Sequence, residues 1–253
     1  MIDALWTRLS LRHRPAANCF LLFHKCGNNY TNALHRLDRG QPYVRDVRMV
    51  TARRISRPRP GRIVNFRCRN FDLACLVEHD LLHRPDARFV VFTRHPASFV
   101  LSATRYHLRG TEAWARRTAQ PHLGGQTLTG ALRAAPDEGA RQIITMTHFS
   151  WLFERMVSFV PCFEERAFLR IRIEELFTAR DPAYYEQLAA FLRLGDRAAF
   201  RRALMAASPA FKPSLPDHAT GSFRQADPVG ALAPAARAYY AAQWQQFAER
   251  LGY

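Results

Sequence analysis

The sequence predicts a single α/β domain over residues 1–253, with a mainly parallel central sheet of four to five strands and helices on both faces. Short apolar runs alternate with stretches of helical spacing, and this alternation is typical of parallel sheets. Turn-forming residues follow the apolar runs, which places loops at the strand ends. At 253 residues, 48% of them hydrophobic and 23% charged, the chain can form one large core. No internal repeat or domain boundary is visible.

The first α/β unit lies near the N-terminus. The run Cys19–Phe23 is apolar and aromatic-rich, as expected of a buried parallel strand. It ends at His24–Asn29, a turn-forming stretch. Apolar residues at helical spacing then predict a helix from Tyr30 to Leu37.

The next segment contains the clearest strand of the chain. Residues 38–61 are rich in Arg, Pro and Gly and predict a basic loop, and Arg62–Phe66 is a candidate second strand. Helical spacing follows over Phe71–Leu82. Arg88–Thr93 is the strongest strand pattern, and Pro96 suits the first turn of a helix that runs to Tyr106.

The second half of the chain is mostly helical in pattern. Residues 109–137 predict a short helix plus a loop, Arg141–Val160 a long amphipathic helix, and Phe168–Ile173 a fourth strand. The remaining elements are helices at 182–194 and 196–206, a Pro-rich polar segment at 208–227, and a helix over 233–251.

The charge balance is the most unusual feature of the composition. Lys and Arg number 37 against 21 Asp and Glu, so the net charge is +16. Such an excess attracts polyanions of several kinds, including nucleotides and sulfated or phosphorylated substrates. Only Lys25 and Lys212 are lysines, so the other basic residues are arginines. A lysine retained against so strong a preference for arginine indicates a need for its compact charge.

Cysteine usage and the lack of targeting signals favour a reducing compartment. The five cysteines form no CxxC pair, which argues against a zinc ribbon or a disulfide framework. Met1–Ala17 has no apolar h-region, and no run of about 18 apolar residues could span a membrane. These features predict a cytoplasmic protein.

The turn after the first strand carries candidate anion-binding chemistry. A loop between a buried strand and a helix start exposes backbone N–H groups, and the helix dipole adds positive potential there. Lys25 contributes a full charge, so the loop could hold a phosphate; the alternative is an ordinary turn with a solvated lysine. The loop is not a Walker A sequence, since Lys25 precedes Gly27, and no Asp follows the third strand to support Mg²⁺.

The turn after the third strand offers a second candidate. Arg94 leaves the end of a buried strand, and Ser102 lies about two helical turns later. Together they could bind one phosphate, Arg94 through two N–H donors and Ser102 through its hydroxyl.

These segments resemble the motifs of sulfotransferases that use 3′-phosphoadenosine 5′-phosphosulfate (PAPS). KCGNNY at Lys25–Tyr30 resembles the family's 5′-phosphosulfate loop, and RHPASFVLSATRYH at Arg94–His107 resembles its 3′-phosphate motif. Weaker similarities lie at Arg172–Leu176, Gly221–Arg224 and Leu251–Tyr253. The matching segments occur in the family's order over most of the chain.

The resemblance implies a P-loop-like fold and sulfuryl transfer from PAPS to a hydroxyl or amine. Lys25 would stabilise the charge on the leaving phosphate, Arg94 and Ser102 would hold the 3′-phosphate, and Arg224 would close over it. No metal is expected. The acceptor would be a small molecule, or a glycan or peptide, with an anionic acceptor as one option. The implied donor-binding residues of the first loop are Lys25, Cys26, Gly27, Asn28, Asn29, Tyr30 and Thr31, with Tyr30 at the position of a tryptophan near the adenine.

The sequence does not decide which residue is the general base. The family's histidine after the second strand has no counterpart here, because that region reads Asn65–Asn70. His24, beside the donor loop, has the best position and is the candidate for catalysis together with Lys25. The other candidates are Asp46, Glu78, His79 and His148.

Two other classes of function remain as alternatives. One is a P-loop kinase-like phosphotransferase, against which the missing Walker sequences argue. The other is a non-catalytic polyanion or nucleic-acid binding protein, but the arginines are spread along the chain without a nucleic-acid motif, so no nucleic-acid partner is expected. The oligomeric state is not predicted. The arginine-rich usage favours a bacterial source.

Overall fold

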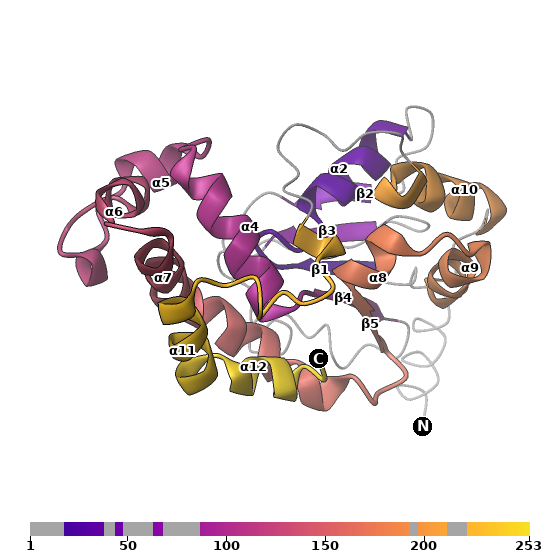
Figure 1. Ribbon diagram of the computed structural model, residues 1–253. Coiled ribbons are helices and arrows are strands. Elements are labelled where there is room, and N and C mark those ends of the chain that lie inside the picture. Colours follow the sequence, from indigo (N-terminus) through magenta and orange to yellow (C-terminus); the bar gives the residue numbers. More distant parts are fainter. Residues whose placement is uncertain (1–17, 38–43, 48–62, 68–86, 193–196, 212–221) are drawn as a thin grey trace, which may run out of the picture.

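The protein is an α/β structure built on one parallel sheet (Figure 1). The computed structural model describes residues 18–37, 44–47, 63–67, 87–192, 197–211 and 222–253. Within these ranges five strands pair in the order β2-β3-β1-β4-β5, and every pair is parallel. The strands are β1 (Asn18–Leu22), β2 (Val44–Val47), β3 (Ile63–Arg67), β4 (Arg88–Thr93) and β5 (Phe168–Arg172). The predicted α/β class is confirmed.

The two strands beside the candidate loops form the centre of the sheet. All five residues of β1 are buried, and β4 is buried from Phe89 to Thr93. Their register pairs Asn18 with Arg88 and Leu22 with Phe92. Burial on both faces explains why these strands read as continuous apolar runs and were easy to identify in the sequence.

Strand β2 corrects one prediction. It lies within residues 38–61, where the sequence predicts only a basic loop. Its four residues are Val-Arg-Asp-Val, so half of them are polar and no apolar run is visible. The strand lies at the edge of the sheet and pairs only with β3, so its formation depends on that partner rather than on its own sequence. The predicted helix over residues 71–82 falls outside the described residues.

The helices after the two central strands begin close to their predicted positions. Helix α2 (Asn28–Leu37) follows β1, and α4 (Pro96–Leu108) follows β4. His95 caps α4, because its Nδ1 accepts a hydrogen bond from the Ala97 backbone N–H at 3.1 Å. Burial lowers the pKa of His95 to about 4, so its ring is neutral and can accept.

Residues 109–137 hold more structure than the single short helix predicted there. The segment forms α5 (Ala113–Arg117), a 3₁₀ turn η1 (Pro121–Leu123) and α6 (Leu128–Ala134). The long helix α7 (Glu138–Ser158) starts before its predicted position, because the Asp137 carboxylate accepts from the Ala140 N–H and caps it.

The C-terminal third contains the two helices predicted at 182–194 and 196–206, together with short elements that the sequence merged or missed. They are η2 (Val160–Cys162), α8 (Ile173–Thr178), α9 (Pro182–Phe191), α10 (Arg197–Ala207), η3 (Pro209–Phe211), η4 (Ser222–Arg224), α11 (Pro234–Gln243) and α12 (Gln245–Arg250). The predicted helix over 233–251 is interrupted at Trp244. The side chain of Trp244 is buried against Phe153, with ring centroids 4.8 Å apart, and its backbone adopts φ −118°.

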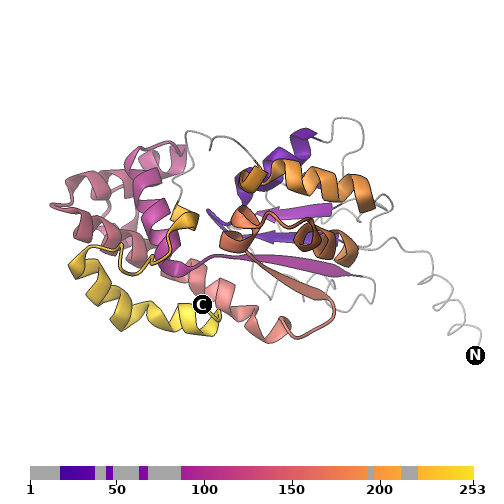
Figure 2. The same cartoon turned by 45° about the vertical axis from the view of Figure 1, so that its right-hand side comes forward.

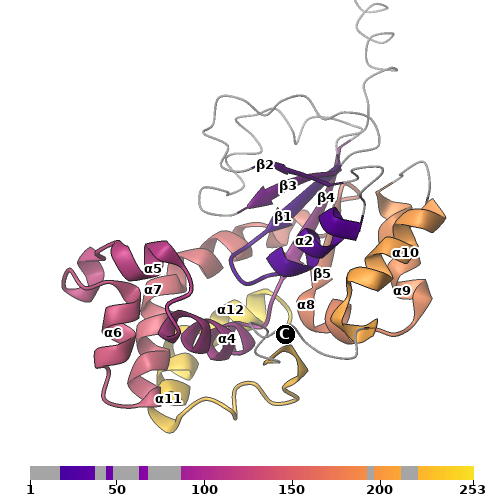
Figure 3. The same ribbon diagram turned by 90° about the horizontal axis from the view of Figure 1, so that it is seen from above.

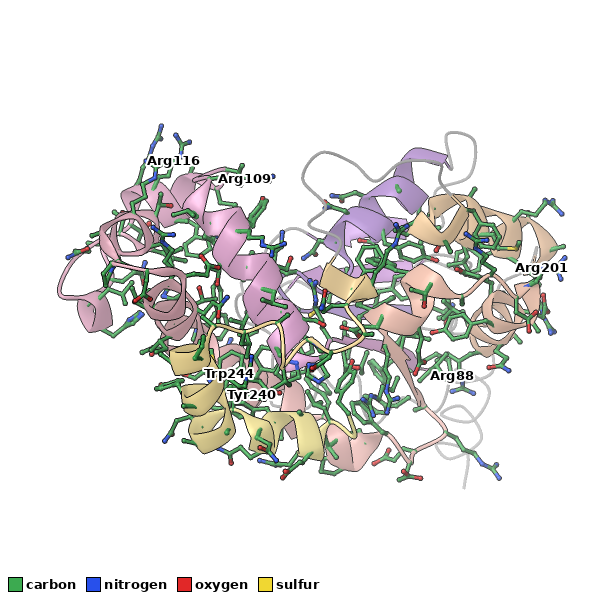
Figure 4. The ribbon with its side chains drawn as sticks, viewed as in Figure 1. Arg88, Arg109, Arg116, Arg201, Tyr240 and Trp244 are labelled. Carbon is green, nitrogen blue, oxygen red and sulfur yellow. The ribbon has the colours of Figure 1, made fainter. Side chains whose placement is uncertain are left out.

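Two groups of helices flank the sheet. Helices α2 and α8–α10 lie on one side, and α4–α7 with α11 and α12 form a helical lobe on the other (Figures 1 and 2). Figure 4 shows Tyr240 and Trp244 directed from the α11–α12 region into this lobe, while Arg109 and Arg116 point away from it. Among the described residues, no helix combines the length and apolarity needed to cross a membrane.

Candidate functional site

The candidate site lies at the carboxyl edge of the sheet, where the chain leaves β1 and β4. After β1 the chain runs to β2 and β3 on one side, whereas β4 and β5 extend the sheet on the other. The boundary between β1 and β4 is therefore the topological switch point, the usual ligand position in open α/β sheets. Figure 3 shows α2 and α4 leaving this region in different directions.

The bend after β1 has a tight backbone that requires glycine at one position. The Cys26 N–H donates to the Phe23 carbonyl at 3.0 Å, and Lys25 adopts a positive φ of 59°. Gly27 has φ 95°, and a Cβ there would lie 3.1 Å from Cδ1 of Ile173. Both its conformation and this close approach exclude larger residues without strain. Ile173 begins α8 directly after β5, and Leu22 of β1 and Phe92 of β4 also adjoin Gly27. The ends of β1, β4 and β5 therefore meet here.

A direct hydrogen bond joins the two bends. Arg94, which leaves the end of β4, donates from Nη1 to the backbone carbonyl of Lys25 at 2.8 Å. The Arg94 side chain is buried, with 5% of its surface exposed. The sequence expectation that these bends adjoin one another is therefore met by a contact between them.

Lys25 is held in an environment that disfavours its charge. Its Nζ lies 3.4 Å from the centre of the Tyr106 ring, an arrangement that stabilises a cation. Burial and then the charge of Arg94 lower the pKa of Lys25 to about 8, against an opposing effect of Glu112. Burial also lowers the pKa of Arg94. Two adjacent buried cations would both be stabilised by an anion bound between them, so this edge fits an anionic ligand.

Most of the predicted donor-loop side chains maintain the loop itself. Asn28 donates from Nδ2 to the Phe23 carbonyl at 3.3 Å, and the Thr31 hydroxyl donates to the Asn28 carbonyl at 3.0 Å. Cys26 is fully buried, whereas Asn29 is exposed. Asn29 is thus the exposed residue of this loop at the start of α2.

Tyr30 is not placed as a stacking surface. Its ring is 2% exposed and lies 6.0 Å from Phe177, and its hydroxyl donates to the Leu204 carbonyl of α10 at 3.1 Å. Burial raises its pKa well above the ordinary value. The side chain anchors α2 to α10, so contact with an adenine would require the ring to move.

The two remaining predicted phosphate ligands lie on elements that meet each other. Ser102 is in α4 and is 3% exposed. Arg224 ends η4, which packs against α4 and α8; Figure 1 shows this turn in gold in front of the sheet. Arg224 is exposed and its guanidinium lies 5.4 Å from the ring of Phe223. The η4 segment therefore covers α4, while Ser102 would need a local rearrangement to reach a ligand.

His24 belongs to a pair of histidines that the sequence did not identify. Its Nε2 lies 3.0 Å from Nε2 of His107 in α4, and His107 is 1% exposed. Ligand atoms of His24, His107 and Glu112 all lie within 4.8 Å of one another, a set that could hold a metal ion, whereas the sequence predicts none. The spacing Phe99–Ala103–His107 along one face of α4 is a signal that could have placed His107 inside the protein.

Of the other base candidates, only His148 has a side chain that the structure describes. His148 lies in α7 and is 6% exposed, with Nδ1 2.9 Å from Nε2 of His122 and its ring stacked on Trp114. Asp46 lies in β2, of which only the backbone is described. Glu78 and His79 fall outside the described residues.

A second polar cluster borders the site and was also missed. Glu174 of α8 accepts from the His95 backbone N–H at 3.1 Å and from the Tyr253 hydroxyl at 3.3 Å. The Tyr253 oxygen also lies 3.3 Å from the Thr93 hydroxyl. The carboxylate of Glu174 supports the charge of Arg94. The sequence signal was the similarity at Arg172–Leu176 and Leu251–Tyr253, which gave no side-chain role.

Comparison with known structures finds the same fold in a sulfotransferase. A crystal structure of the mouse sulfotransferase SULT7A1 complexed with PAP is similar to this one, with a TM-score of 0.51 and 15% sequence identity. The match covers 94% of this chain and 87% of that chain. At this identity the likeness concerns the fold alone. No protein-family model matches the chain, and a search of curated proteins finds no match.

Proposed function

We propose that this protein is a sulfotransferase that moves a sulfuryl group from PAPS to a hydroxyl or amine acceptor. The observation that carries the proposal is the 2.8 Å hydrogen bond from Arg94 to the Lys25 carbonyl. It joins the bend after β1 to the bend after β4, the two candidate phosphate-binding segments, at the switch point. The sulfotransferase-like fold supports the same reaction class. The acceptor is a small molecule, or a glycan or peptide, and the reaction takes place in the cytoplasm.

In this proposal the two bends bind opposite ends of the donor. Lys25, the Gly27 backbone and the start of α2 hold the 5′-phosphosulfate, and Arg94 with Ser102 and Arg224 holds the 3′-phosphate. The acceptor oxygen or nitrogen forms a bond to sulfur while the bond from sulfur to the 5′-phosphate oxygen breaks. The electron pair of that bond leaves with the phosphate, and the Lys25 ammonium stabilises the new charge.

A thermal-shift comparison tests donor recognition. Adenosine 3′,5′-bisphosphate should raise the melting temperature without Mg²⁺, because the two bends supply the positive charge. ATP with Mg²⁺ would stabilise the protein instead if it were a kinase-like phosphotransferase. Binding to random DNA with a steep salt dependence, and no shift with the bisphosphate, would favour a polyanion-binding protein and overturn the proposal.

A transfer assay tests the reaction itself. Radiolabelled PAPS is incubated with a panel of phenols, alcohols, amines and glycans, and the label in the products is counted. Lys25→Ala should abolish transfer while the circular dichroism spectrum remains that of the native protein. The matched control is Arg105→Ala, which removes an exposed cation from α4 and should transfer normally. Normal turnover by Lys25→Ala would show that the role given to Lys25 is wrong.

A further inference from the structure

We propose that His24 and His107 share one proton and act together as the base that accepts the proton of the acceptor. The inference rests on the proposed sulfuryl transfer, which it deepens by choosing one base and adding a positioning residue. It starts from the contact between the two Nε2 atoms and from the position of His24, next to Lys25 in the bend after β1.

The geometry of the pair is that of a straight hydrogen bond. The two ring centres are 5.2 Å apart and the two Nε2 atoms are 3.0 Å apart. The difference of about 2.2 Å is close to two ring radii, so both nitrogens lie almost on the line that joins the ring centres. One ring therefore directs an N–H at the lone pair of the other, and the pair holds a single proton between its facing nitrogens.

The same geometry argues against a metal ion as the main occupant. His24, His107 and Glu112 have the ligand types of a His₂Glu zinc site. A bound ion, however, lies off the line between its two histidine nitrogens, because their lone pairs must converge on it at an angle. Here the lone-pair directions face each other instead. The positive charge of Lys25, which lies close enough to Glu112 to be influenced by it, also opposes a dication.

Neighbouring side chains hold the two histidine rings in place and shield them partly from water. His107 stacks at 5.5 Å on Phe149 of α7, and His24 stacks on the same ring at 5.4 Å. The titratable and charged groups around the pair, either beside it or one residue or ring away, come from each neighbouring element. They are Lys25 in the bend, Tyr106 in α4, Glu112 before α5 and His148 in α7.

Glu112 is itself held in place beside the pair. Both its oxygens are engaged, one by the Tyr106 hydroxyl at 3.5 Å and the other by Nε1 of Trp114. A fixed carboxylate near two imidazoles stabilises the positive charge that develops when the pair takes up a proton. This provides the electrostatic support that a base needs in a site crowded with cations.

The proton transfer follows from this arrangement. The acceptor hydroxyl gives its proton to the pair through the ring of His24, which lies next to Lys25 in the bend. The oxygen electron pair forms the new bond to sulfur, and the bond from sulfur to the donor phosphate breaks. The resulting positive charge is shared through the Nε2–H···Nε2 contact, so His107 acts as a positioning residue that never touches the acceptor.

Nuclear magnetic resonance tests the pair without any activity. In protein labelled with ¹⁵N-histidine, a shared proton gives a scalar coupling between the two Nε2 nuclei across the hydrogen bond. We expect this coupling in the native protein and its loss in His107→Phe. The His122–His148 pair supplies an internal control, whose own coupling should persist in that variant. Absence of the His24–His107 coupling, or stoichiometric Zn²⁺ in the purified protein that is lost in His107→Phe, would overturn the inference.

Kinetics then test the role in catalysis. With phenol as acceptor, His107→Phe should lower kcat by about 10²–10³-fold, with little change in the KM for PAPS. With 4-nitrophenol at slightly alkaline pH the acceptor is already ionised, so the same variant should lose less than about threefold. A merely structural role would reduce both rates equally, and that result would overturn the proposal.

Two further variants test the role of the histidine pair separately from the proposed sulfuryl transfer. His107→Gln keeps a hydrogen-bonding group opposite His24 and should recover about tenfold of the lost rate, while the exposed His122→Ala should be indistinguishable from the native protein. If the coupling is present but no acceptor receives label from PAPS, the proposed function fails and the pair stands only as structure. If transfer occurs and His107→Phe is unaffected, the inference alone fails.

Discussion

Lys25 combines a costly environment with the chemistry proposed for it. Its positive φ, its burial and its proximity to Arg94 are all unfavourable in the folded protein without a ligand, whereas the Tyr106 ring stabilises the cation. Residues that destabilise the unliganded fold are typical of functional sites, where a ligand supplies the missing interaction. The sequence signal, a lysine retained among arginines, pointed to this position, but only the structure reveals the energetic cost.

Replacing Lys25 by Met should stabilise the protein and abolish transfer. The folded-state pKa is lowered to about 8 from 10.5, so folding disfavours the charged form. Wild-type stability should therefore rise with pH between about 8 and 10.5, and below pH 8 the full cost is present. The variant should gain up to about 3 kcal/mol at neutral pH and nothing above the unfolded-state pKa. Urea unfolding at several pH values measures this difference.

The control for that prediction is the exposed Arg105→Met in α4. It removes a cation that is not buried, so its effect on unfolding should stay within about 0.5 kcal/mol at all pH values. A Lys25→Met variant that is less stable than the wild type at neutral pH would contradict the assigned environment.

Gly27 should tolerate no side chain. Alanine at this position would adopt φ 95° and bring its Cβ to 3.1 Å from Ile173, so both backbone strain and a steric contact result. We expect Gly27→Ala to lose about 2–3 kcal/mol in urea unfolding. Gly124→Ala is a matched control, since it has φ 63° but no atom within 4 Å of its Cβ, and should lose only about 1 kcal/mol. Equal losses in the two variants would show that the close approach to Ile173 has no effect.

At the scale of elements, the buried strands could be predicted from the sequence and the edge strand could not. Strands β1 and β4 are covered on both faces, so their apolar runs identify them from sequence alone. Strand β2 has two adjacent polar residues among its four and depends on β3, so no local signal distinguishes it from a loop. The break at Trp244 is set by packing against Phe153 of a helix about ninety residues earlier, which helical periodicity cannot reveal.

The contact of Tyr253 with the ends of β4 and β5 joins the last helix to the site. Its ring lies beneath the guanidinium groups of Arg170 and Arg172, at 5.3 and 5.0 Å, and its hydroxyl donates to Glu174. Burial raises the pKa of Tyr253 well above its ordinary value, so the hydroxyl keeps its proton and can donate. Glu174 in turn fixes the His95 backbone at the start of α4.

Removing the hydroxyl of Tyr253 should loosen this contact. Tyr253→Phe leaves one Glu174 oxygen without its donor, and we expect a loss of about 1–2 kcal/mol in the free energy of unfolding. Tyr239→Phe is the comparison, because its hydroxyl makes a 3.4 Å exposed contact with Thr147 and should cost less than about 0.5 kcal/mol. Thermal unfolding of both variants measures this difference. An unchanged melting temperature in Tyr253→Phe would contradict the role assigned to the hydroxyl.

At the scale of the whole molecule, the sequence predicted the meeting of the two bends better than the side chains around them. Parallel strands place their carboxyl ends at one edge, so the meeting of the bends at Lys25 and Arg94 follows from topology. His107 and Glu174 reach the same edge only through the course of α4 and the position of α8. Sequence spacing gives the face of a helix but not its direction in space, so these two residues could not be assigned.

Binding of the bisphosphate should depend on pH through the protonation of Lys25. A bisphosphate bound between Lys25 and Arg94 favours the protonated lysine, whose pKa in the free protein is lowered to about 8. Binding near that pH should therefore be accompanied by proton uptake, because part of the free protein has an uncharged Lys25. Calorimetric titration with adenosine 3′,5′-bisphosphate in buffers of different ionisation enthalpy measures this uptake.

The affinity should then fall as the pH rises above about 8, by up to tenfold per pH unit, until the pKa of the bound state is reached. An ordinary exposed lysine would produce this decline only near pH 10.5, so the onset separates the two environments. The net charge of +16 predicts a general weakening by salt as well, but that effect is shared by all cations and should persist in Lys25→Met. The proton uptake should vanish in Lys25→Met and remain in Arg105→Met. Uptake that survives the loss of Lys25 would assign the coupled proton to another group and remove the main electrostatic argument for this binding site.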